Sequence, residues 1–249
     1  MTRRQKTLWA RKFLGLADKI AIKFARKLIT EFRRFWSRAS DSYDGGLFNL
    51  SDDLTASHAA NVINILDDLV NETGKAFAVF TMPKIPPLNP DDAFGDKVIA
   101  QIRAQAQADA AEIANTTIDR ARKIVADQTA LGKTPDQIRD ELVKQIGISK
   151  SRAATIARTE VHAASNAVTY ARAERATEVS GMDVTLEWIS TNDGRVRDDH
   201  KRADGQRVKL GEPFNVGGTK MRRPSDPAGG AANVINCRCV LGFSVGEDE

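Results

Sequence analysis

Helical periodicity is the feature that most constrains the fold of this chain. Between Phe94 and Thr129, apolar residues recur at three- and four-residue spacing for about nine turns of helix, while Arg, Gln, Asp and Glu fill the other positions. An amphipathic α-helix places such residues on two opposite faces. A helix of this length either spans between modules or packs lengthwise in a bundle, so we predict a largely helical middle region.

The N-terminal part of the chain carries two further helical patterns. Residues 4–38 have an apolar stripe opposite a face of Lys and Arg, and residues 55–80 return to helical spacing. The first helix could occupy a groove of a partner, lie on a membrane surface, or pack in its own domain with its basic face in solvent. His58, near the start of the second helix, is expected to be exposed.

Two more helices are predicted after the middle one. Thr134 and Gln137 form a capping box with Pro at the first helical position, which starts a short helix that ends at Gly147. Ser149 then caps a helix over about residues 150–178. We therefore expect these two helices to form an αα-hairpin.

A proline-rich segment divides the chain. Four prolines between Met82 and Asp92 exclude a helix and favour a stiff, extended connector, so a domain boundary is predicted there. The predicted segments are a basic helical arm with the Pro-rich linker (1–92), a helical region (93–147) and a C-terminal domain (148–245). The fold class is α+β, with long helices in the N-terminal and middle regions and a short antiparallel sheet near the C-terminus.

The charge of the chain is unevenly distributed. Residues 1–39 contain twelve Lys and Arg against two acidic residues, a net charge of about +10, whereas the whole chain has a formal net charge of +4. A basic segment of this kind is typical of proteins that bind an acidic partner, nucleic acid or a membrane surface. The candidate contacts with nucleic acid or a protein partner are Arg3, Arg4, Lys12, Lys23, Lys27, Arg33 and Arg34.

A membrane partner is not expected. No apolar run reaches the length of a transmembrane helix. The basic N-terminal segment interleaves its apolar residues with Lys and Arg, and so lacks the apolar core of a signal peptide.

The C-terminal residues predict a small sheet. Residues 184–190 alternate as a β-strand, residues 206–208 begin a second strand, and residues 234–243 form a final strand. Between them we expect a short helix at 195–202 and a loop at 211–233.

Cys237 and Cys239 are the two cysteines of the chain, and in a strand they would point to the same side. With His200 they form a partial Zn²⁺ ligand set, to which an Asp or a water would add the fourth ligand. Alternatively, the thiols pack as small apolar groups in the core, or one of them is a nucleophile. A single residue between two cysteines does not suit a disulfide framework, which indicates a reducing compartment.

A second group of polar residues lies in the same half of the chain. We expect it to form a buried structural network between helix and sheet, with an arginine paired to Glu160 because an unpaired carboxylate in an apolar stripe is costly. The alternative is a metal-dependent nuclease or transferase that uses Asp193, His200 and the two cysteines. The members of the network are Arg158, Glu160, His162, Asn166, Asp193, Arg195, Arg197 and His200.

Several of these residues belong to motifs that follow one another in a fixed order over residues 134–243. They are Ala157-Arg158-Thr159-Glu160 and Asn166, Trp188, Asp193-x-Arg195-x-Arg197-x-x-His200, Asp204-Gly205-Gln206, Phe214, Pro224-x-Asp226-Pro227 and Ile235-Asn236-Cys237-Arg238-Cys239. Through this ordered set of motifs the chain resembles the phage Mu F-like family of minor head, or head morphogenesis, proteins. Many relatives have His-Pro before Asn236, where this chain has Val-Ile, and this difference removes a possible metal ligand.

The resemblance implies a virion component of a tailed phage or prophage, assembled in the host cytoplasm and located inside the capsid near the portal. It implies association with the portal protein and a role in head assembly, DNA packaging or ejection. We expect the protein to have no enzymatic activity and to require no cofactor. Capsid or scaffold proteins and packaged double-stranded DNA are further expected partners. The basic residues of 1–39 would contact DNA through its phosphates, or dock on the portal.

Overall fold

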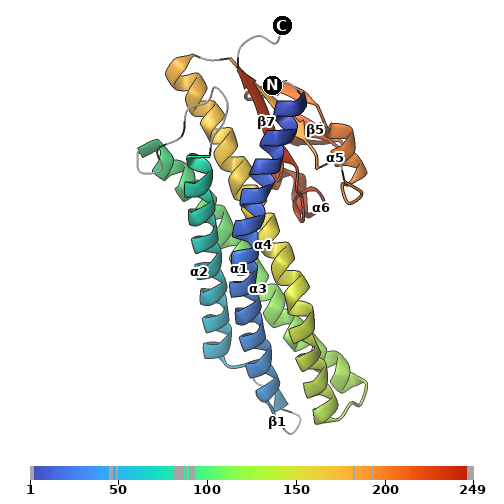
Figure 1. The fold of residues 1–249 in the computed structure, drawn as a ribbon. Coiled ribbons are helices and arrows are strands. Elements are labelled where there is room, and N and C mark those ends of the chain that lie inside the picture. Colours follow the sequence, from blue (N-terminus) through green and yellow to red (C-terminus); the bar gives the residue numbers. More distant parts are fainter. Residues whose placement is uncertain are drawn as a thin grey trace.

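The computed structural model describes residues 3–44, 47–48, 50–80, 87, 89, 93–181, 183–191 and 193–245. Most of these residues form four long helices: α1 (Arg3–Asp41), α2 (Asp52–Ala78), α3 (Ala93–Ala130) and α4 (Pro135–Ser180). The helices pack along one another in an elongated bundle, and a small sheet domain lies at one end of it (Figure 1). The predicted α+β class, helical in its N-terminal and middle regions, is confirmed.

Local signals in the sequence set several of the helix ends. The side chain of Ser51 accepts a hydrogen bond from the backbone of Leu54 and caps the start of α2. Thr134 and Gln137 form the predicted capping box at the start of α4. That helix ends at Gly181, whose φ of 63° lies in the left-handed region that glycine adopts without strain.

The predicted αα-hairpin is wrong, because α4 runs unbroken through both of its proposed helices. Gly147 lies inside the helix, and the hydroxyl of Ser149 donates to the carbonyl of Gln145 at 2.8 Å instead of capping a new helix. A glycine inside a helix costs only about 1 kcal/mol relative to alanine. The burial of Leu142 and Ala153, on either side of it, outweighs that cost.

A cluster of aromatic rings joins the bundle to the sheet domain. Phe13 of α1 packs against Phe77 of α2, with ring centroids 4.6 Å apart. Trp9, one turn earlier in α1, contacts Phe243 at 6.0 Å. Because α1 is packed along its whole length, it is part of the core and not a separate arm. Whether the three predicted segments fold independently stays a prediction.

The sheet domain contains a three-stranded antiparallel sheet. Its central strand, β3 (Val184–Ile189), pairs with β4 (Arg207–Lys209) and β7 (Val240–Val245). Alternate residues of β3 are buried, as its sequence pattern predicts. Shorter elements complete the chain: the hairpins β1 (Tyr43–Asp44)–β2 (Leu47–Phe48) and β5 (Phe214–Val216)–β6 (Thr219–Met221), the helices α5 (Asp198–Ala203) and α6 (Gly230–Val234), and the 3₁₀ turn η1 (Pro227–Gly229).

Two predictions for the C-terminal residues are wrong. The loop expected at 211–233 contains β5, β6, η1 and most of α6, and the strand expected at 234–243 begins only at Val240. Asn236 has a φ of 61°, a left-handed conformation that a strand cannot accommodate. Cys237 and Cys239 therefore lie in an irregular segment between α6 and β7.

His58 is not exposed, contrary to the prediction. It is fully buried, and its Nδ1 lies 2.8 Å from a carboxylate oxygen of Glu31 on α1. Its ring packs on that of Phe35 with centroids 4.4 Å apart. The pattern of apolar residues did not reveal this contact because the partner lies on a different helix.

Some predictions fall on parts of the chain that the structure does not describe. The proline-rich connector at 82–92 lies outside the described residues except for Pro87 and Asn89, and so does the side chain of Arg3. None of the described helices combines the length and the apolar character needed to cross a membrane.

Candidate functional site

The two thiols and one imidazole meet inside the sheet domain. His200 lies on α5, and its Nδ1 is 3.4 Å from Sγ of Cys239 and 3.6 Å from Sγ of Cys237. All three side chains are at most 2% exposed. They form a group of possible metal ligands whose donor atoms lie within 4.8 Å of one another. The irregular backbone, and not a strand, turns the two cysteines toward the same point.

The surroundings of this thiol–imidazole cluster fix the imidazole ring. The indole of Trp188 meets it edge to face, with centroids 5.5 Å apart. The Nε2 atom faces away from the sulfurs and lies 3.3 Å from Oδ1 of Asn233 on α6. The hydrogen bond between the cysteines lowers the pKa of Cys237, and the same contact raises the pKa of Cys239, so the pair favours a single thiolate.

Asn166 connects α4 to the strand that follows the cysteines. It is fully buried, and its side-chain amide donates to the carbonyls of His162 at 2.9 Å and Cys239 at 3.1 Å. Its Oδ1 accepts from the backbone of Leu241 at 2.9 Å. Both ends of this amide are satisfied, so Asn166 fixes the position of β7 against the bundle.

Arg158 and Thr159 hold the turn just before the cysteines. The guanidinium of Arg158 donates to Oδ1 of Asn236 at 2.7 Å, and the Thr159 hydroxyl accepts from the Asn236 backbone at 3.0 Å. These contacts support the left-handed conformation of Asn236. Arg158 is a member of the predicted polar network, whereas Thr159 is not, because only the meeting of α4 with this turn reveals the role of its hydroxyl.

The residues of the loop before α5 form a separate set of contacts. The guanidinium of Arg238 pairs with Asp193 at 2.7 Å and lowers the pKa of that carboxyl. The side chain of Arg195 is 79% exposed, and Arg197 donates to the carbonyl of Ile235. The expected single buried network is therefore divided into several local contacts, with Arg195 at the surface.

The side chains of Glu160 and His162 take no part in these contacts. The expected arginine partner of Glu160 is absent, since none of the described residues forms an ion pair with it, and Arg158 binds Asn236 instead. Burial, followed by the charge of Asp109, raises the pKa of Glu160 to about 8. Burial also lowers the pKa of His162 to about 4, and neither ring nitrogen has a hydrogen-bond partner.

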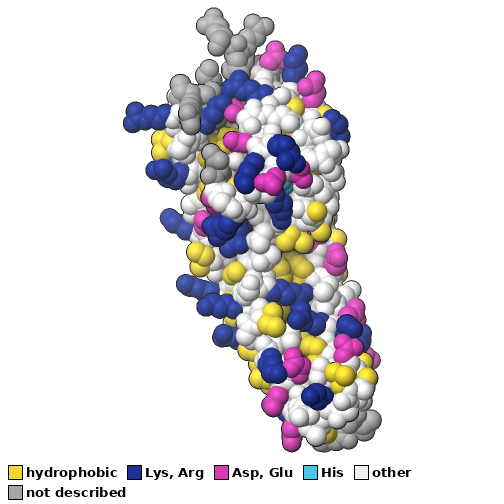
Figure 2. All heavy atoms as spheres, turned by 90° about the vertical axis from the view of Figure 1, so that its right-hand side faces the viewer, with side chains coloured by type: hydrophobic (Ala, Val, Ile, Leu, Met, Phe, Trp, Pro, Cys, Tyr) yellow, Lys and Arg dark blue, Asp and Glu magenta, His cyan; other side chains and the backbone are white. Residues whose placement is uncertain are grey.

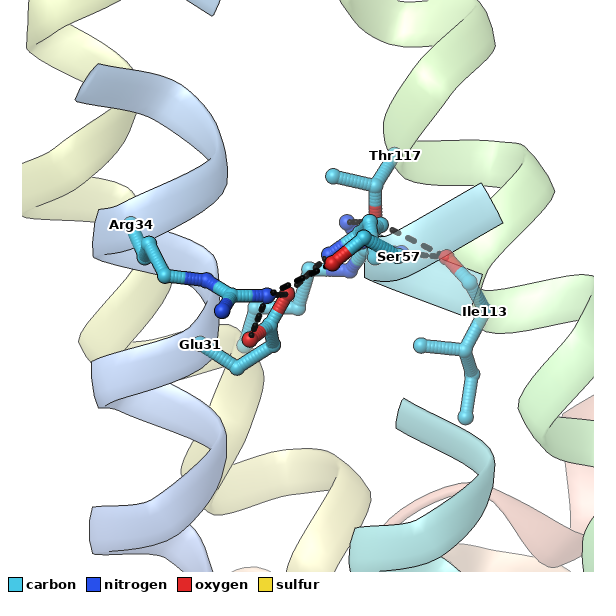
Figure 3. A network of polar contacts seen from close by, with 7 residues as sticks. Glu31, Arg34, Ser57, Ile113 and Thr117 are labelled. Carbon is cyan, nitrogen blue, oxygen red and sulfur yellow. Dashed lines mark hydrogen bonds and ion pairs between the residues drawn. The ribbon is translucent and has the colours of Figure 1, made fainter. Parts of the chain in front are cut away.

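Glu160 lines a large groove between α3, α4 and the segment from Arg222 to Ile235. The groove has a volume of about 1360 Å³, and much of its lining is apolar, with Ile113 and Ala163 among the lining residues. Arg152 lies at the same groove but donates to Thr117 and to the carbonyl of Ile113. Figure 3 shows Ile113 and Thr117 together on α3. Arg152 is thus engaged with α3 and does not pair with Glu160.

The structure divides the basic residues of α1 into two groups. Lys23 pairs with Glu72 and Lys27 with Asp68, both on α2. Arg34 turns toward Glu31 and the hydroxyl of Ser57 (Figure 3). Lysine and arginine side chains gather along one long edge of the molecule in Figure 2. The residues of α1 that are exposed and have no ion-pair partner among the described residues are Arg4, Arg11, Lys12, Lys19, Arg26 and Arg33.

Four of these cations form one row. Lys12, Lys19, Arg26 and Arg33 follow one another at seven-residue intervals, about 10.5 Å apart along the helix. Two of them, Lys19 and Arg26, were not among the predicted contacts. The seven-residue spacing was the signal in the sequence that could have identified them.

The arrangement gives little support to a nuclease or transferase site. Asp193 is held by Arg238, while Asp198 and Asp199 pair with Lys201 and Arg202 on their own helix. In the described part of the chain, the group of metal-ligating side chains around His200 contains no carboxylate. The acids and the histidine therefore do not converge on one point.

The fold and these contacts define an α+β protein in which a helical bundle carries a small sheet domain, and in which the polar groups mainly join one element to another. Residues 119–242, from α3 to β7, match the family model of Phage Mu protein F like protein. Through this half of its length the chain belongs to the phage Mu F-like family, which identifies it as a virion-associated protein of phage head morphogenesis. No curated protein and no solved structure matches the chain.

Proposed function

We propose that the protein is a non-enzymatic minor head protein that associates with the portal, inside the capsid, and acts in head assembly and in DNA packaging or ejection. The family match over residues 119–242 carries this proposal. The internal use of the polar residues supports it, since Asn166, Arg158 and Asp193 each bind another element of the same chain. Assembly takes place in the host cytoplasm, where capsid or scaffold proteins are further partners.

The elongated shape of the molecule suits such a role. The bundle places the sheet domain at one end and the β1–β2 hairpin at the other (Figure 1). Two partners, one bound at each end, would be separated by at most the length of α4, which at 46 residues is about 69 Å. This geometry allows one molecule to contact the portal and a second head component at the same time.

The test is co-expression of the full chain with the portal protein encoded by the same phage or prophage, followed by affinity purification of the portal. Deletion of residues 1–92 is not a suitable variant, because α1 contributes to the core against α4. We expect the folded chain to co-purify with the assembled portal at a constant ratio. A portal that assembles normally but does not retain the folded chain would disprove the association.

A second candidate function, binding of packaged double-stranded DNA, is favoured by the row of Lys12, Lys19, Arg26 and Arg33. These side chains are exposed and without ion-pair partners in the described part of the chain. If all four contact phosphates, the logarithm of the DNA affinity should fall with the logarithm of the salt concentration with a slope of about −3.6. Base sequence should have little effect, since phosphate contacts do not read it.

The matched pair of variants is Lys19→Gln/Arg26→Gln and Lys23→Gln/Lys27→Gln. Both remove two positive charges from α1, but only the first removes cations that lack an ion-pair partner. Fluorescence anisotropy with a DNA duplex should show that the first variant reduces the salt slope by about 2, and the second by much less. Equal effects of the two variants would show that DNA binding depends only on the net charge of the chain. The row would then not be a DNA-binding surface.

A further inference from the structure

We propose that His200, Cys237 and Cys239 bind one Zn²⁺ ion, through Nδ1 of the histidine and the two sulfurs, with Asn233 holding the imidazole in place and a water as the fourth ligand. The three ligands come from α5 and from the segment between α6 and β7, so the ion would join two parts of the sheet domain. This inference does not depend on the proposed role in the phage head.

The distances from the imidazole nitrogen to the two sulfurs are those of a tetrahedral zinc site. With Zn–N of about 2.0–2.1 Å and Zn–S of about 2.3 Å, a nitrogen and a sulfur ligand lie about 3.6 Å apart. The observed separations of Nδ1 from the two sulfurs are 3.4 Å and 3.6 Å. The imidazole nitrogen therefore already lies at the ligand-to-ligand distance of a zinc site from both sulfurs.

The hydrogen-bond partners of His200 orient it as a metal ligand. The Oδ1 atom of Asn233, at 3.3 Å, can only accept, so Nε2 carries the ring proton and Nδ1 presents its lone pair to the sulfurs. One lone pair can accept a hydrogen from only one thiol, so the second thiol can bond only to the neighbouring sulfur. A zinc ion uses the lone pair and both sulfurs, and an imidazole held through its second nitrogen is the usual arrangement around such ions.

The location of the site favours a structural ion over a catalytic one. All three ligands are at most 2% exposed, and Trp188 closes the site on the side of the imidazole ring. The elements that the ion would connect are short: α5 has six residues and α6 has five. Small elements of this kind bury little apolar surface, so a metal ion contributes much of their stability.

The cysteine spacing is compatible with the proposal because the backbone is irregular. The amide of Cys237 donates to the carbonyl of Val234 at 3.0 Å, which closes a turn, and Asn236 within that turn is left-handed. The turn brings the two sulfurs to the same side of the backbone without the two-residue spacer of common zinc motifs.

The experiment measures metal binding by the full chain with zinc alone, and then with cobalt as a spectroscopic probe. The reduced chain, equilibrated with zinc and freed of excess ion, should retain about one equivalent, and its melting temperature should rise with zinc but not with magnesium. With cobalt it should show thiolate-to-metal absorption. Cys237→Ser and Cys239→Ser should each abolish stoichiometric binding, and Asn233→Ala should weaken it by about 10- to 100-fold.

Asn166→Ala is the matched control, because Asn166 contacts the Cys239 carbonyl but no ligand atom. It should destabilise the domain and still bind about one zinc. A folded chain that retains no zinc and gives no cobalt–thiolate absorption would refute the site, and so would undiminished binding by the two serine variants. If those variants fail to fold, the cobalt spectrum of the unaltered chain decides between the outcomes.

Discussion

The burial of Glu160 between α3 and α4 can be tested through the pH dependence of stability. Its carboxyl lies on α4 at the groove beside α3, is 8% exposed, and has no ion-pair partner among the described residues. Burial raises its pKa from 4.5 to about 8. The substitution Glu160→Gln keeps the shape of the side chain and removes its ability to ionise.

The sign of the effect follows from proton linkage. Between pH 4.5 and pH 8 the folded chain keeps the proton of Glu160 while the unfolded chain loses it, so stability falls as the pH rises through this window. Each pH unit in the window is worth about 1.4 kcal/mol, which gives a loss of about 3 kcal/mol at pH 7. The Gln variant avoids this loss and should be more stable than the natural chain by a similar amount.

His162 contributes the opposite slope at lower pH. Its pKa falls from 6.5 to about 4, so stability is lost as the pH drops through that range. In the natural chain the two effects offset each other between pH 4.5 and pH 6.5, and only the Glu160 effect remains above pH 6.5. The difference between the natural chain and Glu160→Gln isolates the carboxyl.

The measurement is urea unfolding followed by circular dichroism at several pH values. The control is Glu178→Gln, which neutralises an exposed carboxyl of the same helix. We expect the stability gain of Glu160→Gln to be near zero at pH 4.5 and to grow toward pH 8. A gain that does not change with pH, or one that the control reproduces, would contradict the burial of Glu160 as an unpaired carboxyl.

Three further predictions concern the continuity of α4, the buried side chain of Asn166 and the ion pair of Asp193 with Arg238. Gly147→Ala should raise the free energy of unfolding by about 0.5–1 kcal/mol in thermal or urea unfolding, since the added methyl meets no atom within 4 Å and α4 is continuous there; a loss of stability would favour the hairpin. Asn166→Ala should lower the free energy of unfolding by about 2–4 kcal/mol, because the buried backbone groups that bond to the amide lose their partners. A loss below about 1 kcal/mol would show that Asn166 does not hold β7 against the bundle. Asp193→Ala should lower the free energy of unfolding by less than about 1 kcal/mol, because the ion pair is partly exposed, and a loss as large as that of Asn166→Ala would indicate a buried network.

The sequence by itself determined the long helices and the class of the fold. Apolar spacing predicted α1, α2 and α3 to within a few residues, and the capping box located the start of α4. These features depend on contacts between residues three or four positions apart, so a single segment contains all the information they need. The alternation of β3 was predicted for the same reason.

Only the tertiary structure decided which side chains meet. His200 and Cys239 are 39 positions apart, and Arg158 and Asn236 are 78 apart, so no local pattern specifies either contact. The continuity of α4 through Gly147 depends on burial against other helices, which outweighs a local helix-breaking signal. The packing of the helices also decides which cations of α1 are paired. The acids that pair with Lys23 and Lys27 lie on α2, which faces only one side of α1.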